Sequence, residues 1–313
     1  MNWKQLISAK RFGMEEFHEE RQENRSEFQR DYDRLIFSAP FRRLQNKTQV
    51  FPLPGSVFVH NRLTHSLEVA SVGRSLGDDV AKALLERHPE LQDSFLPEIG
   101  SIVSAACLAH DLGNPPFGHS GEKAISTFFS EGKGVRLKEK QPNGEQLSPM
   151  EWEDLTHFEG NANAFRILTH QFEGRRKGGF VLTYTTLASI VKYPFSSSLA
   201  GTKSKFGFFV SEEESFQKIA TELGLTLLNE HPLKYARHPL VYLVEAADDI
   251  CYQMMDIEDA HKLKILTTQE TQDLLLSYFP EERKMHMLKT LKLVSDVNEQ
   301  IAYLRSCVIG LLI

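Results

Sequence analysis

Residues 98–116 read EIGSIVSAACLAHDLGNPP, and this stretch decides how the chain folds. Positions 98–110 are apolar on nearly every side, which indicates a helix buried at the centre of the molecule. We expect the helix to end at Asp111-Leu112-Gly113, because Pro115-Pro116 cannot continue it. A histidine and an aspartate at the end of a buried helix need a partner that replaces water, and a metal ion would be one.

Helical periodicity dominates the rest of the chain and predicts an all-α fold with minor or no strand content. Apolar residues recur at spacings of three and four over 64–87, with Thr64 as the expected N-cap. Ser120 is the expected cap of a second helix. Further helices are predicted at 159–172, 183–192, 238–262 and 282–313.

Two segments are expected to be loops. Residues 131–156 are rich in glycine, proline and charge, and are typical of a surface excursion or lid. Residues 194–212 lack periodicity and carry Lys203 and Lys205, and the only strand signal there is the weak one of KFGFFV.

We expect one large helical domain over 1–313, with its core at about 28–262 and the start of a C-terminal helical region at 263–313. The last residues, CVIGLLI, are apolar and lack a helix stop signal. They either dock on another surface or precede further chain beyond Ile313, and we favour further chain.

The composition is that of an ordinary globular protein. The 36 basic and 42 acidic residues give a net charge of −6, so the chain as a whole has no nucleic-acid footprint. Cys107, Cys251 and Cys307 are odd in number and lack CxxC spacing, which favours free thiols in a reducing compartment. The charged N-terminal segment does not resemble a signal peptide and no stretch is apolar enough to span a membrane, so we expect a cytoplasmic protein.

An ordered set of metal-binding residue types carries the chemistry. His65 lies in HNRLTHSLEV, His110 and Asp111 follow the buried helix, and Asp248 lies in EAADDICYQMMDIEDA. Two imidazoles and two carboxylates suit a divalent cation and leave positions for water or a phosphate oxygen. A single buried histidine is more often a core residue, but the ordered constellation indicates a metal site and hydrolysis at a phosphate.

Several polar residues could complete such a site. His119 and Glu122 are three residues apart on one helix face and form a candidate acid–base pair. His157 is either a second imidazole of the site or a histidine beside a helix cap. Arg62 precedes His65 by three residues and could bind phosphate. Lys192 taken alone is an ordinary lysine at a helix C-terminus.

One further feature is a polar stripe at Asp248, Tyr252 and Asp256, spaced every four residues on an otherwise apolar helix. Such a stripe is typical of a site wall.

Five motifs together resemble the deoxyguanosinetriphosphate triphosphohydrolase-like branch of the HD superfamily, over about residues 28–262. They are RDYDRLIFSAPFRRLQNKTQVFP, HNRLTHSLEV, HDLGNPPFGHSGE, FEGNANAFR and EAADDICYQMMDIEDA. The resemblance implies hydrolysis of a deoxynucleoside triphosphate, dGTP first, to the deoxynucleoside and inorganic triphosphate. It also implies one divalent ion, Mg²⁺ or Mn²⁺ or another transition ion.

The resemblance assigns a role to each candidate residue. The implied metal ligands are His65, His110, Asp111 and Asp248. The implied catalytic residues are His119, Glu122 and His157. Arg62 and Lys192 would contact phosphate, and the sugar, base or triphosphate would meet Gln49, Tyr193, Tyr252 and Asp256.

The resemblance also suggests partners and rivals. Members of the family form homo-oligomers, hexamers or tetramers, and some bind effector nucleotides or single-stranded DNA, for which this sequence gives no independent support. The enzymatic alternative is another HD phosphohydrolase, a 5′-nucleotidase or a phosphodiesterase. The non-enzymatic alternative is a nucleotide-sensing oligomer that keeps the site only as a ligand pocket.

Overall fold

A computed structural model describes residues 2–16, 25–50, 60–142, 144–174 and 177–313, so the end of the 30–52 motif lies outside the described part. The fold is all-α, as predicted: the strands found in these ranges are β1 (Leu227–Asn229) and β2 (Lys234–Tyr235), which pair antiparallel. The helices before β1 are α1 (Trp3–Leu6), α2 (Glu27–Ile36), α3 (Ala39–Arg43), α4 (Arg62–Arg87), α5 (Ile99–Ala109), α6 (Gly118–Ser130), α7 (Pro149–Thr156), α8 (Gly160–Thr169), α9 (Tyr184–Ile190) and α10 (Glu213–Glu222). The helices after β2 are α11 (Val241–Lys262), α12 (Thr268–Leu276), α13 (Glu281–Leu291) and α14 (Val297–Leu312).

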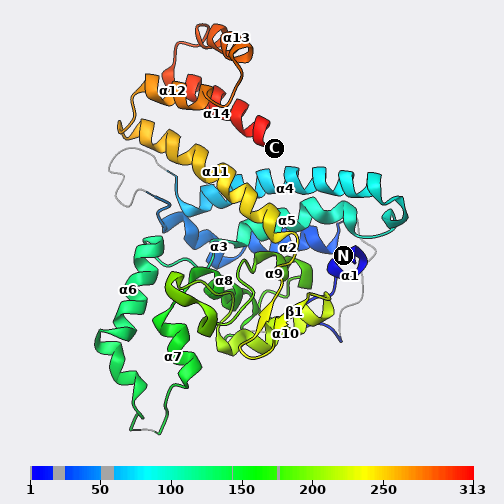
Figure 1. Cartoon of the computed structure of the whole chain (residues 1–313), viewed down its shortest axis with the longest axis vertical. Helices are drawn as coiled ribbons and strands as arrows, with labels where there is room; N and C mark the ends of the chain where they lie inside the picture. The colour runs from blue at the N-terminus through cyan, green and yellow to red at the C-terminus, as the bar shows by residue number, and fades with distance from the viewer. Residues whose placement is uncertain (1, 17–24, 51–59, 143, 175–176) are drawn as a thin grey trace.

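Helix α5 is the centre of the fold, as its sequence predicts. Every residue of α5 except Ser101 is buried, and the helix packs against α2, α4, α9 and α11 (Figure 1). Glycines allow α4 and α5 to approach closely. A Cβ atom at Gly77 would lie only 2.7 Å from the Gly100 Cα atom, and one at Gly73 would lie 2.5 Å from the Cys107 Sγ atom. The main hydrophobic core surrounds this contact and extends back to residues of the N-terminal segment, including Leu6 and Ile7.

Helix α4 begins earlier than predicted, and Thr64 is not its N-cap. Asn61 caps the helix: its side-chain Oδ1 atom accepts hydrogen bonds from the Leu63 and Thr64 backbone N–H groups, each at 3.0 Å. The Thr64 hydroxyl accepts a bond from the Asn61 N–H group at 3.2 Å, which completes a reciprocal capping box. Starting at Arg62, the helix carries Arg62 and His65 on its first turns.

The segment after α5 also differs from its prediction. Ser120 is not a cap, because α6 begins at Gly118, directly after Phe117 in the left-handed conformation at φ 65°. No side chain caps this first turn. Residues 131–156 are not entirely a loop, because they contain a 3₁₀ segment at Lys133–Lys138 and helix α7. Ser148 and Glu151 form a capping box that starts α7, and α6 and α7 pack together (Figure 1).

The loop at 194–212 contains short 3₁₀ turns, and the expected strand signal at KFGFFV does not become a strand. Phe206 and Phe209 of this segment instead bury their rings against Ala162 of α8 and Ala200. Phe208, between them, instead stacks on Phe216 of α10 in the main core, so the hydrophobicity of KFGFFV reflects burial of a loop between two packing sites.

Helix α11 matches the prediction for 238–262, and the C-terminal region is more divided than expected. Residues 282–313 form two helices, α13 and α14, and α12 precedes them. These helices lie beyond α11, away from α5 (Figure 1), around a second hydrophobic cluster that includes Met254, Leu275 and Leu304. The described cysteines are free thiols, and Cys107 and Cys251 are buried in the main core, as predicted. Among the described residues, no helix combines the length and apolarity needed to cross a membrane.

The glycine contact between α4 and α5 gives a prediction about stability. In Gly77→Ala, the new methyl group meets backbone atoms that cannot rotate away, so we expect the free energy of unfolding to fall by about 1–3 kcal/mol. Gly310→Ala in α14 is the matched control, because no atom lies within 4 Å of the new Cβ position. Urea denaturation should show the control unchanged or more stable by up to about 1 kcal/mol. Equal stability of Gly77→Ala and the wild type would contradict the close-packing account.

Candidate metal centre

Three helices bring the predicted metal ligands together. The first turns of α4 carry His65, the end of α5 carries His110 and Asp111, and α11 carries Asp248. Ligand atoms of His65, His110 and Asp111 all lie within 4.8 Å of one another. The Asp248 Oδ1 atom lies 2.8 Å from the His65 Nε2 atom and 3.5 Å from the His110 Nε2 atom. Four residues from three separate parts of the sequence therefore converge on one point.

The His110 ring is oriented by the helix that carries it. Its Nδ1 atom lies 2.6 Å from the Cys107 carbonyl oxygen, which can only accept, so Nδ1 donates the hydrogen bond. The neutral form of this ring therefore has its lone pair on Nε2, the nitrogen that faces Asp111 and Asp248. A hydrogen bond from the ring nitrogen that does not bind the metal is the usual way in which histidine ligands are oriented in metal sites.

An unsatisfied atom shows that the cluster fits a cation. The His110 Nε2 atom is buried beside Asp111 and Asp248 and has no hydrogen-bond partner, which is costly for a polar atom inside a protein. Two imidazoles and two carboxylates form a donor set that suits a divalent ion. The residues present therefore fit a divalent metal, which His65, His110, Asp111 and Asp248 would hold.

Charges around Asp111 are balanced by a buried arginine. The Arg62 Nη1 atom donates to the Asp111 Oδ2 atom at 2.7 Å, and Asn114 donates to the other carboxylate oxygen. Burial works against the ionised form of Asp111, but His110 and Arg62 outweigh it and lower the pKa of this carboxyl group. Burial also opposes charge on His110, yet Asp111 and Asp248 together raise the pKa of His110 to about 9.

The cluster lies at the wall of a cleft of about 470 Å³. Predicted site residues that line this cleft are Gln49, Arg62, His110, Asp111, His119, Glu122, Lys192, Tyr193, Asp248 and Tyr252. The cleft also contains residues that the sequence interpretation did not assign, namely Asn114, Glu159, Asn161, Lys205 and Glu245. Glu159 and Asn161 lie in the motif FEGNANAFR, whose likeness to the family was the only available signal for them.

The predicted acid–base pair is formed. The His119 Nδ1 atom lies 2.8 Å from the Glu122 Oε2 atom, and the His119 side chain is 85% exposed whereas the Glu122 side chain is 10% exposed. A carboxylate accepts, so Nδ1 is the donor and Nε2 is left free. An exposed imidazole oriented by a buried carboxylate is suited to proton transfer at the cleft.

Besides the fully buried His65, two predicted residues lie outside the cleft wall. His157 ends α7, and its Nδ1 atom lies 3.2 Å from a carboxylate oxygen of Glu153, so its position is that of a histidine beside a helix end. Asp256 lies one turn after Tyr252 on the same face of α11, and burial raises the pKa of both side chains.

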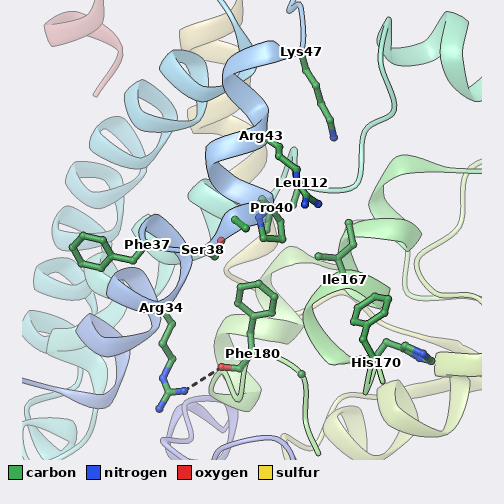
Figure 2. A pocket seen from close by; sticks show the side chains of 13 residues that line it. Arg34, Phe37, Ser38, Pro40, Arg43, Lys47, Leu112, Ile167, His170 and Phe180 are labelled. Atoms are coloured by element: carbon green, nitrogen blue, oxygen red, sulfur yellow. Dashed lines mark hydrogen bonds between the residues drawn. The ribbon is translucent and has the colours of Figure 1, made fainter. Parts of the chain in front are cut away.

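A larger cavity of about 650 Å³ lies on the other side of Leu112 and is a different kind of space (Figure 2). Arg34, Arg43 and Lys47 line it together with aromatic side chains such as Phe180, and its described lining contains no carboxylate. The Lys47 Nζ atom donates to the Asn114 carbonyl oxygen at 2.6 Å. Because metal ligands are absent from its walls, this cavity is not the candidate metal centre.

Comparisons with known proteins agree with this geometry. The HD domain family model matches residues 62–177. A deoxyguanosinetriphosphate triphosphohydrolase-like protein of Pseudomonas aeruginosa is 46% identical over 88% of this chain and 61% of its own length. A protein of Synechocystis with the same name is 44% identical over 88% of this chain and 64% of its own length. A deoxyguanosinetriphosphate triphosphohydrolase of Yersinia enterocolitica is 36% identical over 90% of this chain and 59% of its own length. The chain thus spans about 60% of the length of these relatives.

The raised pKa of His110 predicts that metal binding releases a proton. Without a cation the ring is protonated below pH 9, and a ligand nitrogen must be deprotonated, so a divalent ion must displace that proton. We expect about 0.9 proton released from His110 per Mn²⁺ bound at pH 8, against about 0.03 for a histidine of ordinary pKa near 6.5. Calorimetry in buffers of different ionisation enthalpy measures this number. If almost no proton is released at pH 8, His110 is not a ligand that must lose a proton before it binds the metal.

Proposed function

We propose that this chain, which is similar over 88% of its length to a deoxyguanosinetriphosphate triphosphohydrolase-like protein, belongs to that branch of HD-domain proteins and hydrolyses deoxynucleoside triphosphates to the deoxynucleoside and inorganic triphosphate. The observation that carries the proposal is the His119–Glu122 pair in the same cleft as the His–Asp cluster. The names of the relatives point to dGTP as the first substrate to test.

The proposed cofactor is one Mg²⁺ or Mn²⁺ ion held by His65, His110, Asp111 and Asp248. When bound, such an ion polarises a phosphoryl oxygen and lowers the pKa of a coordinated water. Arg62 would then contact a phosphate group as well as Asp111, because its guanidinium group also borders the cleft.

Cations suit the cleft to a triphosphate. Arg62 and Lys192 line it, and the Lys192 Nζ atom is held 3.0 Å from a carboxylate oxygen of Glu245. The first turn of α6 has no side-chain cap, and its residues Gly118–Ser120 line the same cleft. The Gly118 and Ser120 N–H groups already donate to the Pro115 and Phe117 carbonyl oxygens, so this end of α6 would add little to the two side chains.

The proposed role of His119 is proton transfer to the leaving oxygen. Glu122 fixes the proton on His119 Nδ1, which leaves Nε2 as the nitrogen that exchanges a proton with the substrate. The exposure of His119 in the cleft allows such contact without movement of α6.

The proposed sugar-reading residues are Tyr252 and Gln49. The Tyr252 ring is 44% exposed in the cleft, and Asp256 lies one turn further along the same helix face. The Gln49 Oε1 atom is buried and has no hydrogen-bond partner, so a sugar hydroxyl could donate to it. A rigid ring against the sugar would exclude a 2′-hydroxyl.

Product analysis tests the proposed function. Each of the four deoxynucleoside triphosphates and GTP is incubated with Mg²⁺ and then with Mn²⁺, and ³¹P NMR identifies the phosphate product. Intact triphosphate from the deoxynucleotides supports the proposal. Orthophosphate or pyrophosphate would support another HD phosphohydrolase, and binding without turnover in any metal would support a nucleotide-sensing protein.

The role of His119 predicts a specific loss. His119→Gln removes the titratable imidazole, so we expect kcat to fall about 10²- to 10⁴-fold. Metal content and nucleotide affinity should stay within about threefold, because neither depends on this side chain. His88→Gln is the matched control, because His88 is exposed beside Glu90 and does not line the cleft, and its kcat should remain near the wild-type value. An unchanged rate in His119→Gln would remove His119 from the mechanism.

The role of Tyr252 predicts a change in sugar selectivity. Tyr252→Ala opens space beside the sugar, so the ratio of kcat/KM for dGTP over GTP should fall about 10- to 100-fold. Tyr252→Phe keeps the ring and should keep the selectivity, which separates steric exclusion from hydrogen bonding. Steady-state kinetics with both nucleotides gives the ratio. If Tyr252→Ala rejects GTP as well as the wild type does, the sugar is read elsewhere.

A further inference from the structure

Four charged or titratable side chains follow one another along the cleft wall, in the order His119, Glu122, Lys205 and Glu159. We propose that Lys205, held by Glu159, is a positioning residue that keeps the Glu122 carboxylate as the acceptor for His119 Nδ1–H. This inference rests on the proposed function, because it specifies what sets the proton position on His119.

The distances connect the four side chains in sequence. The Lys205 Nζ atom donates to the Glu159 Oε1 atom at 2.8 Å and lies 3.8 Å from the Glu122 Oε2 atom. That same Glu122 oxygen lies 2.8 Å from His119 Nδ1. One ammonium group therefore stands between two carboxylates, and the nearer contact of Glu122 is the imidazole.

Glu159 is a fixed anchor for Lys205. Its side chain is 1% exposed, and one of its oxygens accepts from the Asn161 and Ala162 backbone N–H groups as the N-cap of α8. Its other oxygen accepts from Lys205 and from the Asn161 side chain. With both oxygens engaged, Glu159 cannot turn away from Lys205, so the position of the ammonium group is determined.

The backbone beside Glu159 also holds Glu122. The Gly160 N–H group donates to the Glu122 Oε1 atom at 2.7 Å. A Cβ atom at Gly160 would lie 2.9 Å from that oxygen and 2.1 Å from Asn114 Oδ1, so only glycine leaves room for this contact. Glu122 is thus held on one oxygen by Gly160, and its second oxygen is shared between His119 and the charge of Lys205.

Packing of the loop that carries Lys205 places this residue beside Glu159 and Glu122. Phe206, the next residue, is fully buried and joins Phe209 in the cluster that docks the loop on α8. The Lys205 side chain is 26% exposed, and its stem is covered by this arrangement. The buried Phe206 on the loop and the ion pair with Glu159 at the start of α8 together determine where Lys205 lies.

The electrostatic consequence concerns the two carboxylates. Burial raises the pKa of Glu159, while Lys205 lowers it and the neighbouring Glu122 raises it further. Burial disfavours charge on Lys205, but Glu159, Glu122 and Tyr193 raise the pKa of its ammonium group. Without the cation, the repulsion between the two carboxylates is relieved when Glu122 rotates or a proton is taken up. Either change deprives His119 Nδ1–H of its acceptor.

The experiment measures the proton position on His119 directly. The full chain is labelled with ¹⁵N-histidine, and His119→Gln assigns the His119 ring signals. In the wild type we expect the neutral ring to carry its proton on Nδ1. Lys205→Met keeps the length of the side chain but removes its charge. In this variant we expect that most neutral His119 rings no longer carry their proton on Nδ1. Lys205→Arg, which can still bind Glu159, should restore it.

Kinetics supply a second readout. In Lys205→Met we expect kcat for dGTP to fall about 10- to 100-fold with KM within about threefold, and Lys205→Arg to recover most of the rate. Lys218→Met is the matched control, because it removes a lysine that pairs with Glu15 at 2.6 Å outside the cleft. The control should change neither the His119 tautomer nor kcat.

Two results would overturn the inference. An unchanged His119 tautomer in Lys205→Met would show that Glu122 needs no help from the cation. A rise in KM at constant kcat would instead make Lys205 a contact for the substrate anion. If the wild type hydrolyses no nucleotide, the proposed function fails, whereas the tautomer comparison still decides the role of Lys205.

Discussion

Helix α5 is enclosed on every side, so the polar atoms at its end must find partners inside the protein. His110 satisfies one ring nitrogen with the carbonyl of its own helix, and the other nitrogen faces the carboxylates of Asp111 and Asp248. The enclosure depends on glycines that let α4 approach α5 closely enough to bring His65 to the same point. The rest of the cleft is arranged around this buried group, with Arg62 balancing Asp111 and α11 supplying the fourth ligand.

Opposite charges alternate around the cleft and hold one another in place. Arg62 pairs with Asp111, Lys192 with Glu245, and Lys205 with Glu159. Each cation that borders the cleft is therefore positioned before any anion arrives, which reduces the ordering cost of binding a highly charged ligand. The pairing also means that an incoming phosphate competes with a carboxylate for each cation. Affinity then depends on how far a bound divalent ion offsets the negative charge of the wall.

The sequence predicted the features that depend on local periodicity and residue type. The buried helix, the long α4 and α11, the all-α class and the residues converging on the metal centre all follow from apolar spacing and from polar residues in apolar surroundings. Helix starts were less predictable: Asn61 and Thr64 are both good caps, and only the reciprocal bond decides between them. Ser120 failed as a cap because the left-handed Phe117 starts α6 three residues earlier.

Roles that arise from tertiary contacts could not be read from the sequence. Lys205 lies in a loop without periodicity, and nothing near it in sequence predicts Glu159 as its partner. KFGFFV has the composition of a strand, but its rings pack on α8 and α10, and only the three-dimensional arrangement shows that. His157 was left between two interpretations, and its bond to Glu153 places it at the helix end.

Helix α11 belongs to two hydrophobic clusters at once. Cys251 is its last contributor to the main core, and Met254 joins the separate cluster formed with α12–α14. Tyr252 lies between these two points on a helix of 22 residues, which is about 33 Å of continuous rod. Because α11 is packed at both ends, a displacement of the C-terminal helices would shift the part of the cleft wall that carries Tyr252.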